Sequence, residues 1–272
     1  EAEMLKLMYI TNDPAVAQIA ERAGVDRIFV DLETIGKHER QGGMNTVQSQ
    51  HTVEDVRRIR SVIQKSELLV RTNPIHDGSK QEIDSLIDAG ADVLMLPFFQ
   101  NAEQVKQFLD FVAGRARTML LVETPEAVEN LGEILALNAD EYLIGLNDLH
   151  LGYHRKFMFE LVADGTVENI CARFAQIGKP YGFGGIARVG GGALPAEKII
   201  GEHVRLGSSR VILSRSFCNT SLVTEYEEIE KIFQAEVPKI RTAEQMFIEA
   251  EPEKRMKNHL EVQQIVKEIV GD

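Results

Sequence analysis

The chain has 272 residues, of which 44% are hydrophobic and 26% are charged, and this fits one large α/β domain with an extensive core. Its net charge of −12 argues against nucleic acid or an anionic membrane as a partner, and no apolar stretch approaches the roughly 20 residues that span a bilayer. Two cysteines without metal-binding spacing, and the lack of an opening signal peptide, predict a cytoplasmic protein with free thiols.

The first part of the chain predicts strands at residues 5–10 and 27–30 with a helix between them, which begins at a cap and an early proline. The second strand leads into Asp31-Leu32-Glu33-Thr34. These acids could support a nearby arginine or hold a metal-bound water, and a solvated capping loop is an equally good interpretation. A long polar loop follows at residues 35–52 and contains His38 and His51. Loops of this length at a catalytic edge often act as lids.

Arg71 closes the third predicted strand, residues 67–70, and begins the run Arg-Thr-Asn-Pro. Arginine is always cationic and carries a rigid fork that suits carboxylate or enolate oxygens. Its position at the end of a buried strand favours a substrate contact. The alternative is a structural ion pair with Asp31 or Glu33, and the two roles can coexist.

Two acids follow neighbouring strands in the middle of the chain. Glu123 closes the apolar run 119–122, and Asp148 comes soon after the strand 142–145, behind Leu146 and Asn147. The carboxyl ends of adjacent parallel strands lie at one edge of a sheet, where α/β proteins place their chemistry. Such oxygen ligands suit Mg²⁺ or Mn²⁺ and leave positions open for a substrate. Either acid alone would also serve as a helix cap.

The last predicted strands are residues 181–187 and 210–213, and the former ends in Arg188 and three glycines. This backbone could cradle a phosphate or carboxylate, with Arg188 adding charge, or it could be a simple flexible turn. Eight strands alternating with helices predict a (β/α)₈ TIM barrel over residues 4–219, followed by a C-terminal helical extension at 220–272.

The predicted extension carries two apolar stripes, and an isolated amphipathic helix is marginal in water. We therefore expect these stripes to be buried against a second subunit, in a homo-oligomer. The residues of the two stripes are Ile229, Phe233, Val237 and Ile240, and Leu260, Val262, Ile265, Val266 and Ile269.

The run E-T-x-E-A at residues 123–127, followed by G-x-x-D-L at 145–149, resembles the HpcH/HpaI aldolase/citrate lyase family. The resemblance covers roughly residues 4 to 217. It implies a metal-dependent barrel lyase with Glu123 and Asp148 as metal ligands. The runs Asp-Leu-Glu at 31–33 and Arg-Thr-Asn-Pro at 71–74 resemble the citrate lyase branch, in which the arginine faces substrate oxygens. Related enzymes exchange a C-terminal helix between protomers.

One position departs from the family pattern. Aldolases of the family carry an active-site histidine close behind the second strand, at about the place of Thr34, and this chain has none there. His38 and His51 are the nearby candidates, and we take His38 as the general base. A metal-bound water is the alternative.

The expected reaction is cleavage or formation of a 2-oxo acid or hydroxy-oxo acid through a pyruvate-like enolate. Glu123 and Asp148 would hold Mg²⁺ or Mn²⁺, possibly Co²⁺, and Arg71 would stabilise the enolate oxygen. Leu146, Asn147 and Asp148 would hold the substrate carboxylate through backbone N–H groups, and Arg188 is a further substrate contact. An acyl-CoA lyase and a non-catalytic barrel subunit remain alternatives.

Overall fold

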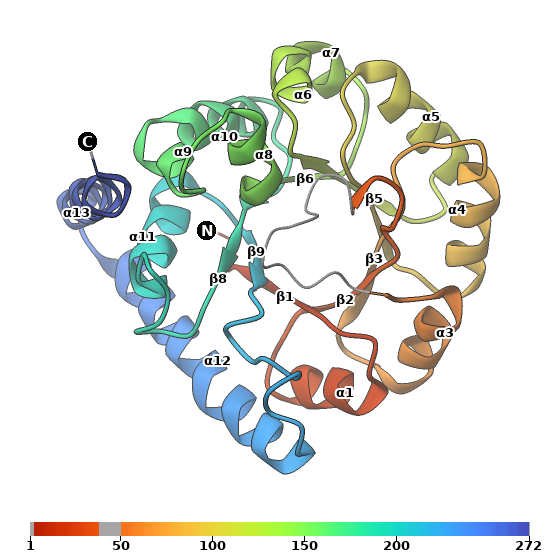
Figure 1. Ribbon diagram of the computed structural model, residues 1–272, viewed down its shortest axis with the longest axis horizontal. Helices are drawn as coiled ribbons and strands as arrows, with labels where there is room; N and C mark the ends of the chain where they lie inside the picture. The colour runs from red at the N-terminus through yellow and green to blue at the C-terminus, as the bar shows by residue number, and fades with distance from the viewer. Residues whose placement is uncertain (1–2, 38–49, 272) are drawn as a thin grey trace.

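The computed structural model describes residues 3–37 and 50–271, and in these the strands form one parallel sheet that curls into a barrel (Figure 1). The order in the sheet is β7-β6-β5-β4-β3-β2-β1-β9-β8. The predicted barrel fold is confirmed. The strands are β1 (Lys6–Ile10), β2 (Arg27–Asp31), β3 (Glu67–Arg71), β4 (Val93–Leu96), β5 (Arg117–Val122), β6 (Glu141–Ile144), β7 (Tyr181–Phe183), β8 (Gly185–Ile186) and β9 (Arg210–Leu213).

The predicted seventh strand, residues 181–187, is split at Gly184 into β7 and β8. Gly184 has a φ of 60°, which is open to glycine without strain, and its N–H donates to the Ile144 carbonyl at 3.0 Å. On one side β7 pairs with β6, and on the other side β8 pairs with β9. The Ser209 N–H also donates to the Tyr181 carbonyl at 2.8 Å, so the kinked strand closes the ring.

Helices alternate with the strands and surround the barrel. They are α1 (Pro14–Arg22), α3 (Val53–Val62), α4 (Ser79–Asp88), α5 (Ala102–Val112), α6 (Pro125–Glu129), α7 (Leu131–Leu135), α8 (Leu146–Gly152), α9 (Glu160–Ala163), α10 (Thr166–Gln176), α11 (Ala196–Leu206), α12 (Tyr226–Glu249) and α13 (Pro252–Val270). Local capping sets several starts: the Asp13 side chain accepts the N–H groups of Ala15 and Val16, and Thr52 and Asp55 form a capping box.

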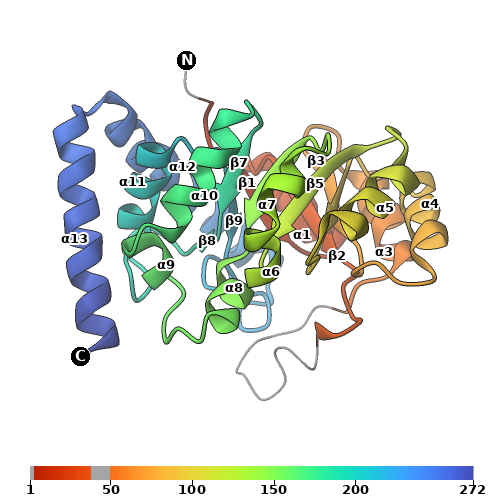
Figure 2. The ribbon, with the colours of Figure 1, turned by 90° about the horizontal axis from the view of Figure 1, so that it is seen from above.

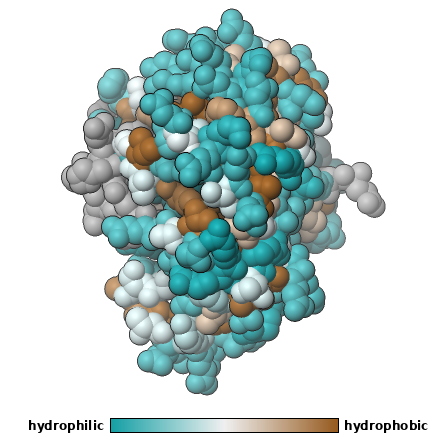
Figure 3. All heavy atoms as spheres, turned by 90° about the vertical axis from the view of Figure 1, so that its right-hand side faces the viewer, coloured by the Kyte–Doolittle hydropathy of each residue, from teal (hydrophilic) through white to brown (hydrophobic). Residues whose placement is uncertain are grey.

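The core has an inner and an outer layer because successive strand residues point to opposite faces of the sheet. The outer layer packs strands against helices and is by far the larger. On the outside, the face that carries α3, α4 and α5 is mostly hydrophilic, with only small apolar patches (Figure 3). The inner layer fills the barrel with Met8, Phe29, Leu69, Val93, Met95, Met119, Leu121 and Leu143.

Buried charges fill the floor of the barrel, at the N-terminal ends of the strands. Arg27, Glu141 and Arg210 are each the first residue of their strand. Arg27 donates to both carboxylate oxygens of Glu141, at 2.8 and 2.7 Å, and Arg210 Nε donates to Oε1 at 2.5 Å. Burial raises the pKa of the Glu141 carboxyl, but its bonds to Arg27 and Arg210 outweigh burial and lower the pKa to about 2. Three distant strands are thus tied together by one carboxylate.

The C-terminal helices do not lie as predicted. α12 runs between α11 and α1, in the place of an eighth outer helix (Figure 1). Its stripe is buried within the chain, where Phe233 packs 4.9 Å from the Tyr9 ring. The Leu5 N–H donates to Glu244 at 2.6 Å. The expectation that this stripe awaits a second subunit is therefore wrong, because β1 and its neighbours already cover it. The predicted division into residues 4–219 and 220–272 thus assigns α12 and β1 to different parts of the chain, although α12 covers β1.

α13 packs outside the barrel wall, on the flank formed by α11 and α9 (Figure 2). Its predicted stripe is divided between two faces: Val262 and Val266 are buried against the barrel, whereas Leu260 is 58% exposed. No helix in the described ranges is both long enough and apolar enough to cross a membrane.

We predict that Glu141→Gln lowers the free energy of unfolding by up to about 3–5 kcal/mol at neutral pH, because it removes the carboxylate that two buried arginines share. Arg27 then keeps its ion pair with Glu67. Arg210 keeps its ion pair with Glu3. The folded-state pKa of about 2 lies below the ordinary value of 4.5. The stabilisation is therefore fully present above that ordinary value and is lost as the pH falls towards 2. Urea unfolding at several pH values measures this difference. Glu54→Gln, at an exposed pair with Arg57, is the control. Equal unfolding midpoints for both variants would contradict the prediction.

Candidate active site

The C-terminal ends of the strands form the mouth of the barrel, and a cavity of about 190 Å³ opens there. The structure brings five predicted site residues into its wall: Arg71, Glu123, Leu146, Asn147 and Asp148. Arg71 ends β3, Glu123 directly follows β5, and the other three form the first turn of α8 behind β6. Ile212 and Ser214, at the end of β9, complete the opposite side.

Glu123 is buried and held in place by two loops. Its Oε2 accepts the Phe98 N–H at 2.8 Å, and Phe98 has a φ of 49°, which turns the backbone after β4 towards this carboxylate. On the other side, a Cβ at position 145 would lie 3.0 Å from Glu123 Oε1 and 2.9 Å from its Cβ. Gly145 therefore lets β6 approach the carboxylate closely.

Asp148 is half-buried and shares two cavities with Glu123. Besides the cavity at the mouth, both acids line a neighbouring cavity of about 300 Å³, together with Phe98 and Pro125. Among the described residues no group of three or more His, Cys, Asp or Glu side chains could hold a metal ion. Two carboxylates beside a cavity still fit a hard divalent cation, which takes oxygen ligands and can complete its shell from substrate and water.

The Arg71 fork is paired with Asp31, its direct neighbour in the register of β2 and β3. Arg71 Nε and Nη2 donate to the two Asp31 oxygens at 2.9 and 2.6 Å, and Lys37 Nζ donates to the same carboxylate at 2.6 Å. The guanidinium also lies over the Phe29 ring, 5.1 Å from its centroid. Arg71 thus makes the predicted ion pair and also lines the cavity. The ion pair uses Nε and Nη2 and does not involve Nη1.

This pairing fixes the charge of both partners. Burial alone raises the pKa of the Asp31 carboxyl, but the Arg71 and Lys37 cations outweigh it and hold that pKa well below its usual range. For Arg71, burial lowers the pKa of the guanidinium, and the Asp31 carboxylate raises it above the ordinary value. Lys37 was not identified from the sequence, because a lysine in a polar loop carries no signal of its partner.

The predicted loop contains two histidines, His38 and His51. His38, the predicted general base, lies outside the described residues. His51 lies against the end of β2, where its Nδ1 accepts the Asp31 N–H at 2.9 Å. It lines a separate cavity of about 270 Å³ that shares Ile212 and Ser214 with the cavity at the mouth.

Arg188 is not brought together with the other predicted residues. It follows β8, and its Nε donates to the Phe217 carbonyl at 2.8 Å, which ties the loops after β8 and β9 together. The residues of the described chain that line the cavity at the mouth do not include it. In the glycine run behind it, the Gly190 N–H donates to Glu197 at 2.8 Å.

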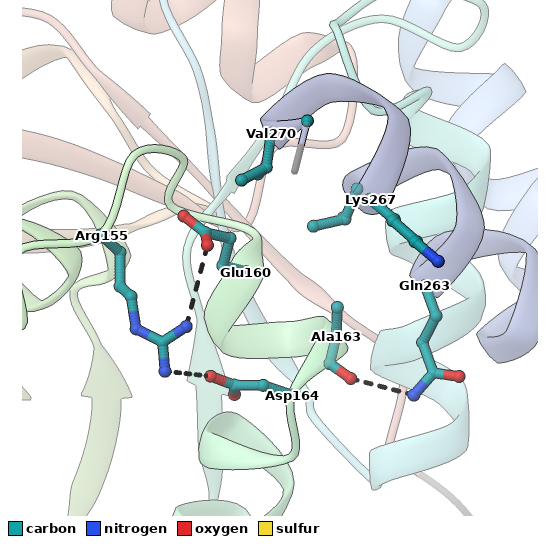
Figure 4. A pocket seen from close by; sticks show the side chains of 9 residues that line it. Arg155, Glu160, Ala163, Asp164, Gln263, Lys267 and Val270 are labelled. Carbon is teal, nitrogen blue, oxygen red and sulfur yellow. Dashed lines mark hydrogen bonds and ion pairs between the residues drawn. The ribbon is translucent and has the colours of Figure 1, made fainter.

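A cavity of about 310 Å³ lies away from the mouth, between α9 and α13 (Figure 4). Arg155 is held there by Asp164 at 2.9 Å and by Glu160 at 3.7 Å, and Gln263 donates to the Ala163 carbonyl at 3.0 Å. These contacts pair Arg155 with two carboxylates and join α13 to the barrel, so we interpret the cavity as a gap between packed helices.

Comparison of the chain with curated proteins gave no match. Comparison with family models gave one that is described as HpcH/HpaI aldolase/citrate lyase and that matches residues 6–189, more than half of the chain. The matched range contains Asp31, Arg71, Glu123 and Asp148, the residues that line or support the cavity at the mouth. The chain therefore belongs to the HpcH/HpaI aldolase/citrate lyase family.

Proposed function

We propose that this protein is a metal-dependent carbon–carbon lyase that cleaves or forms a 2-oxo acid through a pyruvate-like enolate. Aldolase and lyase activity is what membership of the family suggests. The observation that carries the finer proposal is the single cavity shared by Arg71, Glu123 and Asp148. It combines a cation-binding pair of acids with a fixed guanidinium, and an enolate needs both kinds of stabilisation.

Glu123 and Asp148 would hold the cation, Mg²⁺ or Mn²⁺ and possibly Co²⁺. When bound, it would act as a Lewis acid towards the enolate of the 2-oxo acid. Glu123 suits this role because the Phe98 N–H and the close approach of Gly145 fix its carboxylate before any ligand arrives. Leu146 and Asn147 line the same cavity and are the proposed contacts of the substrate carboxylate.

Arg71 would stabilise the negative charge that develops on the keto oxygen. Its pairing with Asp31 holds the fork in one orientation, so little reorganisation is needed when the charge forms. The low exposure of its side chain, 14%, also strengthens the interaction, because little water competes for the charge.

Cleavage breaks the C3–C4 bond, leaves the electron pair in the enolate and releases an aldehyde as the C4 hydroxyl loses its proton. A base must take that proton. His38 stays the residue proposed for this step on the basis of the sequence. Arg188 stays a proposed contact only for a substrate that extends towards the loop after β8.

We also propose a homo-oligomer, now on the basis of α13 alone. Met256 and Leu260 lie four residues apart on this helix and are 49% and 58% exposed.

We predict that the double substitution Met256→Glu and Leu260→Glu lowers the particle mass in sedimentation, because charges would replace apolar contacts. Leu222→Glu, at a residue that is 80% exposed outside the helices, is the control. An unchanged mass for the double variant would remove α13 from the proposed interface.

For the metal, we predict that Glu123→Gln and Asp148→Asn each weaken Mn²⁺ binding by at least about tenfold, since each removes an anionic oxygen ligand. Calorimetric titration of the purified protein measures the affinity. Glu133→Gln is the control, because Glu133 is exposed in the first turn of α7 and lines neither of the two cavities that Glu123 and Asp148 share. Unchanged affinity in both test variants would refute the metal site.

For the reaction, we predict that the protein with Mg²⁺ or Mn²⁺ releases pyruvate from 4-hydroxy-2-oxo acids, and that Arg71→Lys lowers kcat by about 10²-fold. Lysine keeps a charge beside Asp31 but loses the planar fork. Arg155→Lys, at an ion pair away from the mouth, is the control. A parallel assay of acyl-CoA thioester cleavage tests the alternative reaction. Thioester cleavage without pyruvate release would favour the acyl lyase, and near-normal turnover of Arg71→Lys would refute the role of Arg71.

A further inference from the structure

The cavity beside His51 is a chamber between the ends of β1 and β9 that has both polar and apolar walls. Its walls include Thr11, Asn12, Ser214 and Asn219, besides His51 itself. It adjoins the cavity that holds Arg71, Glu123 and Asp148, since both are lined by Ile212 and Ser214. If the 2-oxo acid half of a substrate lies beside the two acids, the other half has this chamber as its continuation.

The contact between His51 and Asp31 determines which ring nitrogen carries the proton. The Asp31 backbone N–H can only donate, and it points to His51 Nδ1 at 2.9 Å. Nδ1 must therefore be the unprotonated nitrogen, and in a neutral ring the proton then resides on Nε2. To act as a base through Nε2, the ring would have to carry its proton on Nδ1, where that proton would face the Asp31 N–H.

The charges around His51 also favour the neutral ring. Burial lowers the pKa of the imidazole, the Asp31 carboxylate raises it, and the Lys37 and Arg71 cations lower it, with a net lowering. Arg215, from the loop after β9, lines the same chamber and adds a further positive charge. Within residues 3–37 and 50–271, the Nε2–H group of His51 makes no hydrogen bond, so it is available to the chamber as a donor.

We infer that His51 is a hydrogen-bond donor for the aldehyde half of the substrate and not a general base. This inference rests on the proposed function. In the direction of addition, the enolate electron pair forms the new C–C bond and the π pair of the aldehyde carbonyl moves to its oxygen. Nε2–H binds that oxygen throughout, and the proton that the oxygen takes up comes from the acid–base group of the proposed function. In cleavage Nε2–H binds the same oxygen, and His51 neither gains nor loses a proton. The hydroxyl and amide groups of the chamber suit a short aldehyde that carries hydroxyl groups.

Two substitutions test the roles of the two ring nitrogens of His51 separately. In His51→Asn, the side-chain oxygen takes the place of Nδ1 and keeps the contact with the Asp31 N–H, but the donor to the chamber is lost. In His51→Gln, the amide group reaches the place of Nε2 and keeps a donor, but the contact with Asp31 is lost. We expect His51→Asn to lower the rate of aldol addition by about 10²-fold, the scale of losing one oriented donor, and His51→Gln to retain more activity.

The assay follows addition of pyruvate to a hydroxylated aldehyde with Mn²⁺ present, with exchange of the pyruvate methyl protons into D₂O measured alongside. A donor role predicts that the ratio of addition to exchange falls in His51→Asn. Exposed His154, changed to Asn and to Gln, is the control. Normal addition by His51→Asn together with impaired His51→Gln would overturn the inference, because it would show that only the Asp31 contact matters.

Nitrogen NMR of the imidazole tests the tautomer without any reaction. We expect His51 to carry an unprotonated Nδ1 and a protonated Nε2 at about pH 8, and to gain a second proton only below the ordinary pKa of 6.5. A ring that titrates normally, or that carries its proton on Nδ1, would overturn the inference. Failure of the intact protein to exchange pyruvate protons or to release pyruvate would instead overturn the proposed function, and the NMR result would still decide the tautomer.

Discussion

Closure of the sheet between β9 and the kinked seventh strand is the constraint on which the rest of the structure depends. At the closure the backbones almost touch, since a Cβ on Gly182 would lie 1.9 Å from the Arg210 carbonyl oxygen. Only a residue without a side chain allows this approach. Because the ring is closed, side chains from opposite strands meet at both of its ends. Arg27, Glu141 and Arg210 therefore meet at the floor, and Arg71, Glu123 and Asp148 surround one cavity at the mouth.

The mouth is organised by the register of β2 and β3, which sets Asp31 opposite Arg71. One carboxylate binds the arginine and a lysine, and the backbone N–H of the same residue binds His51. Asp31 does not line the cavity at the mouth, yet it orients Arg71, which does, and His51, which lines the adjoining chamber. Arg71 and His51, which would bind the two halves of the proposed substrate, are thus both held in place by Asp31.

Much of the fold and part of the site could be predicted from the sequence. Short apolar runs that alternate with amphipathic segments are a strong signal of a barrel, and residues that directly follow such runs fall at its mouth. This is why the sequence correctly predicted that Arg71, Glu123 and Asp148 lie at the mouth. Arg188 also follows a strand, but position alone does not give the direction of a side chain, and it turns to the Phe217 carbonyl. The Phe98 N–H that holds Glu123 is a backbone group and leaves no trace in residue type.

Two features of the fold were not predicted, for different physical reasons. The break at Gly184 had a signal, since glycines within a strand often mark a bend, but a continuous strand fits the apolar pattern of residues 181–187 as well. The placement of α12 had no local signal. An amphipathic stripe shows that a partner exists, but it does not say whether that partner belongs to the same chain.

The position of α12 has a consequence for how the protein is made. This late helix covers the earliest strand: Glu244 accepts the Leu5 N–H, Arg241 donates to the Leu5 carbonyl at 2.7 Å, and Phe233 packs on Tyr9. During synthesis, β1 emerges from the ribosome more than two hundred residues before these partners. The growing chain therefore carries a partly uncovered apolar strand until α12 appears. Contacts of such long sequence separation form late, because the intervening chain must first be ordered. The barrel wall can thus be completed only after α12 has been made.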